Sequence, residues 1–185
     1  MVSISEKLVL WTGEKHSGKT TSTANLVKIA RVEGFNVAGV LAPSIYKDSE
    51  LIGFDIIDLQ DETRVPLAKR DRVGNKVGMF RFFDEGIELG IVALSETATK
   101  SADLVIVDEY GPLELNGRLW RQNVDSLLTL SYALILLVVR RELADEVQRL
   151  YKNFPSRDLA AVEPESIDEV IRMLKNNRQL QRETA

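Results

Sequence analysis

The stretch from Gly13 to Thr20 reads Gly-Glu-Lys-His-Ser-Gly-Lys-Thr. It matches the pattern G-x-x-x-x-G-K-[ST], which is specific for a phosphate-binding loop when it follows a strand and opens a helix. Both conditions are expected here, because an apolar run at residues 7–12 precedes it and a helical pattern at residues 19–33 follows it. The sequence therefore predicts a P-loop, in which backbone N–H groups surround a phosphate at the positive end of a helix.

The residue types of this loop suit the chemistry. Gly13 and Gly18 allow close approach of the backbone, and Lys19 is expected to bring a positive charge to the β- and γ-phosphates. Thr20 is expected to place its hydroxyl on Mg²⁺. The other residues expected to line the bound phosphates are Glu14, Lys15, His16, Ser17 and Thr21.

Two of these loop residues, Lys15 and His16, could have either of two roles. Lys15 is either a second phosphate ligand or a solvated side chain, and the sequence favours the second. His16 is the only histidine of the chain, but a loop-tip position near solvent is favoured over a catalytic role.

A second pattern lies at residues 104–109, Leu-Val-Ile-Val-Asp-Glu. The four apolar residues predict a buried strand, whose carboxyl end would bring Asp108 and Glu109 beside the P-loop. In this Walker B arrangement Asp108 is expected to hold Mg²⁺ and Glu109 to polarise an attacking water. Alone, such a pattern would equally mark a helix cap or a loop start, so the prediction depends on the P-loop upstream.

Short apolar runs alternate with amphipathic stretches along the chain. The runs predict strands buried in a parallel sheet at residues 7–12, 36–41, 103–107, 132–139 and 158–162. Helical patterns occur at residues 19–33, 85–100, 119–130 and 142–151. A last helix is expected to start at Ser166, which forms a capping box with Glu169. This alternation predicts βαβ units of an α/β fold.

Residues 51–82 depart from the alternation. Strand patterns at 51–59, 65–69 and 77–83 are separated by the polar turn 60–63 and by Gly74-Asn75. We expect a β-hairpin or three-stranded meander, at about residues 49–83, inserted between the second and third core strands. No linker or second boundary is visible, so one domain over residues 1–185 is expected.

The composition excludes several classes of protein. The 185 residues include 24 Lys+Arg, 28 Asp+Glu, one His and no Cys, for a net charge of −4. Without cysteine there is no disulfide, thiolate metal site or cysteine nucleophile, so any metal should be a hard cation such as Mg²⁺. The lack of a basic excess argues against a nucleic-acid partner.

The chain shows no signal-peptide pattern or membrane span. The first residues include a glutamate and lack a long apolar region, and the longest apolar run, residues 133–139, is too short to cross a bilayer. A cytoplasmic protein without a membrane partner is expected.

Residues 108–115, Asp-Glu-Tyr-Gly-Pro-Leu-Glu-Leu, resemble the D-E-[IY]-G-[PK]-[ML]-E-L signature of the small nucleoside-triphosphatases first described in thermophiles, which have a cancer-related mammalian relative. Residues 53–59, 63–64, 66–68 and 80–82 also look like that family, and the resemblance covers about residues 8–165. It implies a three-layer, RecA-like, ASCE-type P-loop fold with a mostly parallel sheet. It also implies slow hydrolysis of nucleoside triphosphates, such as ATP and GTP, with broad base tolerance.

The chain departs from that family in the loop, where Lys15-His16 replace a usual Pro-Gly. The glycines, the lysine and the threonine named above are kept, so the phosphate and Mg²⁺ roles carry over, whereas rate and substrate range stay open. Glu114, the second acid of the signature, either orders the loop after Walker B or lies at the surface.

Positive charge for the leaving group is expected from the end of the fourth strand. One of Arg140 and Arg141 is expected to sense the γ-phosphate, the alternative being a charged helix start. A second basic cluster could close over phosphates, contact a partner or, as we favour, be solvated: Arg64, Lys69, Arg70 and Arg72. No NKxD-type guanine motif is present, and the aromatic residues Trp11, Tyr110 and Trp120 are expected to pack rather than to stack on a base.

Three functions remain open at this point. A Mg²⁺-dependent nucleoside-triphosphate phosphohydrolase is favoured. A small nucleotide or metabolite kinase would use the hairpin as an acceptor pocket and the basic cluster as a lid. A nucleotide-binding adaptor or switch would bind without turnover, and the molybdopterin guanine-dinucleotide adaptor proteins have a similar loop. Whether the protein has a protein partner is left open by the sequence.

Overall fold

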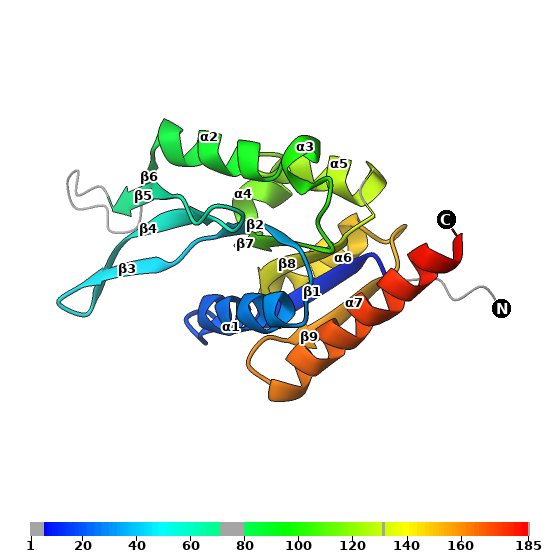
Figure 1. The fold of residues 1–185 in the computed structure, drawn as a ribbon. Coiled ribbons are helices and arrows are strands. Elements are labelled where there is room, and N and C mark those ends of the chain that lie inside the picture. The colour runs from blue at the N-terminus through cyan, green and yellow to red at the C-terminus, as the bar shows by residue number, and fades with distance from the viewer. Residues whose placement is uncertain (1–5, 71–79, 131, 185) are drawn as a thin grey trace.

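The computed structural model of the chain describes residues 6–70, 80–130 and 132–184. Within them nine strands form one sheet in the order β6-β5-β4-β2-β7-β8-β1-β9, with β3 pairing with β4 (Figure 1). The strands are β1 Leu8–Gly13, β2 Val37–Leu41, β3 Ser44–Lys47, β4 Glu50–Asp58, β5 Arg64–Arg70, β6 Phe80–Phe82, β7 Leu104–Asp108, β8 Leu134–Arg140 and β9 Ser156–Ala160. The helices are α1 Lys19–Val32, α2 Asp84–Ala93, α3 Glu96–Thr99, α4 Pro112–Leu115, α5 Arg121–Leu130, the 3₁₀ turn η1 Arg141–Leu143, α6 Ala144–Leu150 and α7 Pro164–Thr184.

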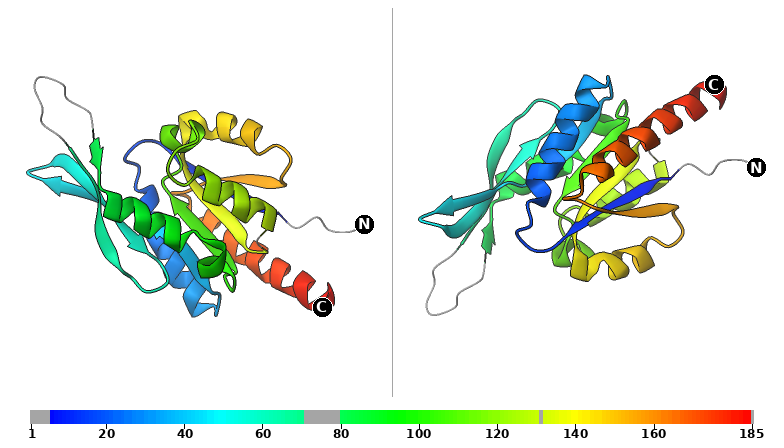
Figure 2. Two further views of the ribbon diagram at one scale, coloured as in Figure 1. Left: turned by 90° about the horizontal axis from the view of Figure 1, so that it is seen from above. Right: turned by 90° about the horizontal axis from the view of Figure 1, so that it is seen from below.

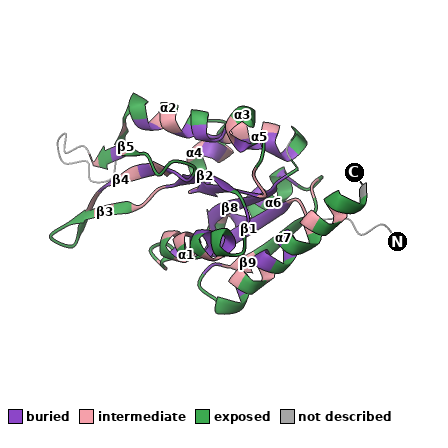
Figure 3. Cartoon of the chain, viewed as in Figure 1, coloured by how far each residue is buried: buried purple, intermediate pink, exposed green. Residues whose placement is uncertain are grey.

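Helices cover both faces of the sheet, which gives three layers (Figure 2). In β1, Leu8 and Leu10 pack in one core cluster with residues of α5 and α6, whereas Val9 and Trp11 pack in the other with residues of α1 and α7. Since successive side chains of a strand point to opposite faces, a strand that is apolar at every position must be covered on both. The central strands are accordingly buried, while β3 is largely exposed (Figure 3).

The sheet has a parallel half and an antiparallel half. Strands β2, β7, β8, β1 and β9 pair in parallel, as the apolar runs predicted. Strands β3 to β6 are antiparallel and extend the same sheet from β2. The strand patterns at 51–59 and 65–69 correspond to β4 and β5, whereas Arg72, Gly74-Asn75 and residues 77–79 lie outside the described residues.

Two helix predictions were wrong. The pattern at 85–100 forms two helices, α2 and α3, because the chain leaves the helix at Leu94 and Ser95 caps a new one by accepting a hydrogen bond from the Ala98 N–H. The last helix begins at Pro164 rather than after Ser166, since proline suits a first helical position, where no N–H is needed. Within the described residues, no helix is long and apolar enough to span a bilayer.

Gly39, in the middle of β2, is required by a close approach to β7. Its φ is +103°, and a Cβ there would lie 2.0 Å from the carbonyl oxygen of Ile106.

Gly39→Ala is therefore expected to lower the free energy of unfolding by about 3 kcal/mol or more, which combines backbone strain with overpacking. Denaturant titration would measure the loss. Gly34→Ala is the matched control, because Gly34 also has a positive φ, +81°, but a Cβ at that position would meet no atom within 4 Å. Equal losses in the two variants would contradict the steric argument.

Candidate functional site

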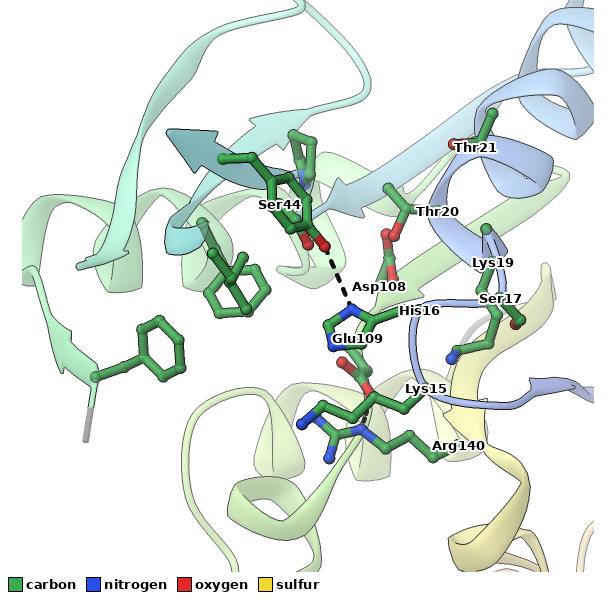
Figure 4. Close-up of a pocket in the computed structure, with 16 residues that line it drawn as sticks. Lys15, His16, Ser17, Lys19, Thr20, Thr21, Ser44, Asp108, Glu109 and Arg140 are labelled. Carbon is green, nitrogen blue, oxygen red and sulfur yellow. Dashed lines mark hydrogen bonds and ion pairs between the residues drawn. The ribbon is translucent and has the colours of Figure 1, made fainter. Parts of the chain in front are cut away.

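A cleft of about 340 Å³ opens at the carboxyl ends of the parallel strands (Figure 4). Residues 15–21, between β1 and the first turn of α1, form one wall. Asp108 at the end of β7, Glu109 after it and Arg140 at the end of β8 form its floor. This is the edge of an open α/β sheet at which ligands bind in general, in the crevice outside the carboxyl ends of the strands.

The loop is closed tightly around its lysine. The buried Lys19 Nζ donates hydrogen bonds to the carbonyl oxygens of Gly13, at 3.3 Å, and Glu14, at 2.8 Å. A Cβ on Gly13 would lie 2.8 Å from Ser17 Oγ, and this hydroxyl is one of two buried side-chain polar atoms without a hydrogen-bond partner among the described residues. Gly18, with φ +89°, turns the chain into α1. The loop thus brings polar hydrogens and one buried cation, Lys19, close together.

His16 lies at the loop tip and is exposed, as expected. Its φ is +61°, in the left-handed region that glycine adopts more readily than other residues. Its Nδ1 lies 3.3 Å from the hydroxyl of Tyr46 on β3, so the loop tip reaches across to the antiparallel half of the sheet (Figure 4).

Asp108 is buried between the loop and the end of β2. Its carboxylate accepts hydrogen bonds from the hydroxyl of Thr20 and, at 3.3 Å, from the Ala42 N–H. Burial raises the pKa of Asp108 to about 7, against the opposing effect of the Thr20 hydrogen bond. The pair supplies a hydroxyl and a carboxylate oxygen side by side, which is the hard-oxygen chemistry that Mg²⁺ prefers. The residues present therefore fit Mg²⁺.

The two consecutive arginines point to different places. Arg140 Nε donates to Glu109 Oε1 at 2.8 Å, and both side chains are about two-thirds buried, with 29% and 32% of their surface exposed. Arg141 pairs instead with Asp158 of β9 at 3.2 Å and is not among the residues that line the cleft. Since successive residues of an extended chain point to opposite sides, only one of the two reaches Glu109.

The cleft brings together most of the residues that the motifs predicted. Those that line it are Lys15, His16, Ser17, Gly18, Lys19, Thr20, Thr21, Asp108, Glu109 and Arg140. Gly13 and Glu14 form the base of the loop and contact Lys19 through their carbonyls, but they do not line the cleft. The motifs missed the opposite wall, which comes from the antiparallel strands and the segment before β3: Pro43, Ser44, Tyr46, Leu51, Phe54 and Phe80.

A family model described as NTPase matches residues 8–174, which include every element of this cleft. The chain belongs to this NTPase family. Two relatives named nucleoside-triphosphatase THEP1 match different shares of the chain. A nucleoside-triphosphatase THEP1 of Methanothermobacter thermautotrophicus is 31% identical over 167 residues, which are 88% of this chain and 90% of the relative. One of Methanopyrus kandleri is 37% identical over 109 residues, 59% of this chain and 60% of that relative, so the match spans less than two-thirds of its length.

Two solved structures share the fold of this NTPase. A human cancer-related nucleoside triphosphatase has a TM-score of 0.66 at 21% identity and covers 94% of this chain and 97% of its own. THEP1 of Aquifex aeolicus has a TM-score of 0.62 at 22% identity and covers 89% of this chain and 94% of its own. The expected three-layer P-loop fold is thereby confirmed.

Large aromatic residues of the NTPase belong to the core. Trp11, Tyr110 and Trp120 are at most 2% exposed, and the Tyr110 hydroxyl lies 2.7 Å from that of Tyr151. They line no part of the cleft, so the expectation that they pack rather than stack on a base is confirmed.

Glu114 orders the segment after Walker B. It is 3% exposed, and its Oε2 accepts a hydrogen bond from the Gly111 N–H at 2.8 Å, which caps α4. Of the two alternatives, loop ordering is therefore observed and the surface position is not. Burial raises the pKa of Glu114 to about 7, although the Gly111 N–H opposes this shift.

The raised pKa makes stability depend on pH. Between about pH 4.5 and 7 the folded chain holds a proton on Glu114 that the unfolded chain has lost, so the free energy of unfolding falls as pH rises through this window. The fall attributable to Glu114 is on the order of 3 kcal/mol. Glu114→Gln keeps an oxygen for the Gly111 N–H but cannot titrate. Urea titrations at pH 4.5 and pH 7.5 should show a flatter pH dependence for the variant than for the wild type; equal slopes would contradict the prediction.

Proposed function

We propose that this NTPase is a Mg²⁺-dependent phosphohydrolase that converts nucleoside triphosphates to diphosphates and phosphate. The observation that carries the proposal is the position of Glu109, which follows the strand that ends in Asp108 and borders the same cleft as the P-loop. A carboxylate at that point can accept a proton from a water attacking the γ-phosphate.

The other residues have roles that follow from their contacts. Lys19 and the backbone of residues 13–20 would hold the β- and γ-phosphates, and Thr20 and Asp108 would hold Mg²⁺. The metal supplies charge neutralisation at the phosphate oxygens when bound. Arg140 would orient Glu109 through the 2.8 Å ion pair and add positive charge beside the γ-phosphate. For Arg141 we propose no catalytic role, since it pairs with Asp158.

Broad base tolerance and slow turnover are part of the proposal. Apart from Ser44 and Tyr46, the polar and charged residues that line the cleft are those of the P-loop, the two Walker B acids and Arg140. Few groups are therefore available to recognise a base. A turnover below about 0.1 per second would be slow against the median enzyme, near 10 per second. We further propose that residues 1–185 form a single domain with an insertion at about residues 49–83.

A phosphate-release assay over ATP, GTP, CTP and UTP tests the proposal. Removing Mg²⁺ with a chelator is expected to lower the release rate by more than about 100-fold, because the charge of the polyphosphate is then no longer neutralised. Restoring Mg²⁺ in excess should restore the rate, which controls for damage by the chelator. Phosphate release that is insensitive to chelation would refute the metal dependence.

A further inference from the structure

The cleft has two chemically different halves. One half consists of the P-loop, Asp108 and Glu109 and is polar. The other is apolar and is formed by side chains of the antiparallel strands and the segment before them: Pro43, Tyr46, Leu51, Phe54 and Phe80. Hydrolysis as proposed above uses the phosphate loop, the magnesium ligands and the carboxylate that activates water. None of these groups needs an apolar wall, so the proposed hydrolysis does not explain the apolar half.

The order of the strands separates this apolar half from the P-loop. The sheet runs β4-β2-β7-β8-β1, so the carboxylates after β7 stand between the loop after β1 and Phe54 on β4. In P-loop proteins the γ-phosphate points toward the Walker B carboxylates. In this arrangement the apolar half would face the γ-phosphate end of a triphosphate held by the P-loop.

Glu109 lies at the junction of the two halves. One oxygen is held by Arg140 at 2.8 Å, and about a third of the side chain is exposed. His16 spans the junction through its contact with Tyr46 (Figure 4). A hydroxyl group entering from the apolar half would meet Glu109 and the γ-phosphate together.

The apolar half suits a flat, uncharged ring. The centroids of Phe54 and Phe80 are 5.0 Å apart with the rings inclined by 58°, and both side chains are only partly buried. The exposed part of such rings gains from covering by a planar molecule, since stacking buries apolar surface and tolerates many ring types.

Charge argues against an anionic occupant. A phosphorylated acceptor would need cations of the antiparallel strands, but Arg64 pairs with Asp55 and Arg70 with Glu50, each at 2.7 Å. Neither arginine lines the cleft, nor does Lys69. The described part of the basic cluster thus does not form a phosphate-binding lid.

We propose that the apolar half binds a neutral nucleoside as phosphoryl acceptor, so that this NTPase, if it cleaves triphosphates as proposed above, also acts as a nucleoside kinase. Glu109 accepts the proton of a sugar hydroxyl, and the hydroxyl oxygen forms a bond to the γ-phosphorus. The bond from that phosphorus to the β,γ-bridging oxygen breaks, and the nucleoside diphosphate leaves with the electron pair. The products are a nucleoside monophosphate, a nucleoside diphosphate and one proton.

Two measurements test the proposal on the whole protein. In the first, ATP labelled on its γ-phosphate is incubated with Mg²⁺ and adenosine, guanosine, cytidine, uridine or thymidine, and labelled monophosphate is separated from labelled phosphate. In the second, each nucleoside is titrated calorimetrically into the protein with a non-hydrolysable ATP analogue. We expect binding and transfer for at least one nucleoside.

Variants locate the site. Phe54→Leu and Phe80→Leu keep apolar bulk but remove the ring, and each should weaken nucleoside binding about tenfold or more. Both rings also pack against the core, so two variants are used, and thermal unfolding of each shows whether its fold is kept. Phe83→Leu is the matched control, since Phe83 is 36% exposed and does not line the cleft; it should bind as the wild type does.

The outcomes separate this proposal from the hydrolase. Phosphate release with no nucleoside bound or phosphorylated overturns the acceptor site and leaves hydrolysis standing. Binding that both cleft variants leave unchanged also overturns it. The acceptor site is supported if phosphoryl transfer occurs or if both variants weaken nucleoside binding. If, in addition, no phosphate is released when the acceptor is left out, hydrolysis is overturned as the activity.

Discussion

Glu109→Gln is expected to lower the rate of phosphate release about 100-fold or more while nucleotide affinity stays nearly unchanged. The amide cannot accept the proton of the attacking water, and general-base catalysis is typically worth about 10²–10⁴-fold in rate. Its oxygen can still accept the hydrogen bond from Arg140 Nε, now 2.8 Å from Glu109 Oε1, so the local geometry is kept. The variant thus removes a proton acceptor rather than a contact.

Steady-state phosphate release and calorimetric titration of a non-hydrolysable ATP analogue check this prediction on the same preparation. Glu88→Gln is a matched control, because Glu88 is exposed on α2 and does not line the cleft. If Glu109→Gln hydrolyses at the wild-type rate, Glu109 does not activate the water. If wild type and variant bind nucleotide equally but neither turns it over, the adaptor or switch alternative is favoured.

The parts of the site that sequence predicted are those set by short, contiguous patterns. The loop at residues 13–20 fixes its own shape through Gly18 and through the hydrogen bonds of Lys19 to its own turn. The apolar run before Asp108 fixes a buried strand and therefore which edge of the sheet receives the carboxylate. Both features depend on neighbours within a few residues, so they can be inferred without knowing the tertiary structure.

The parts that sequence did not predict depend on contacts between distant segments. Nothing near Arg140 and Arg141 says which one meets Glu109, because their partners, Glu109 and Asp158, lie 31 and 17 residues away. The apolar wall likewise arises only when β4 pairs with β5, and β5 with β6. The sequence predicted strands where β4, β5 and β6 lie but missed β3, and the face that each aromatic ring occupies follows from the register of these pairs.

Lys19→Ala is expected to abolish nucleotide binding in the micromolar range, with a loss in affinity of about 100-fold or more. Lys19 is the buried cation of the loop, and its ammonium lies 2.8 Å from the Glu14 carbonyl and 3.3 Å from that of Gly13. Hydrogen bonds to charged groups contribute about 1.5–3 kcal/mol each, and Lys19 is expected to contact two phosphates. Losing about 3 kcal/mol corresponds to more than 100-fold in the dissociation constant.

The same substitution separates binding from folding, which is what makes it informative. Alanine is a good helix former at the first position of α1, so helix formation itself does not oppose the change. Lys19 itself lines the cleft, so water can replace its ammonium, and the thermal midpoint should therefore move by only a few degrees. Lys28→Ala, at an exposed position of the same helix, is the matched control and should bind nucleotide like the wild type. Calorimetry of ATP analogue binding together with thermal unfolding distinguishes the cases: unchanged affinity in a folded Lys19→Ala protein would mean that the loop holds phosphate through its backbone alone.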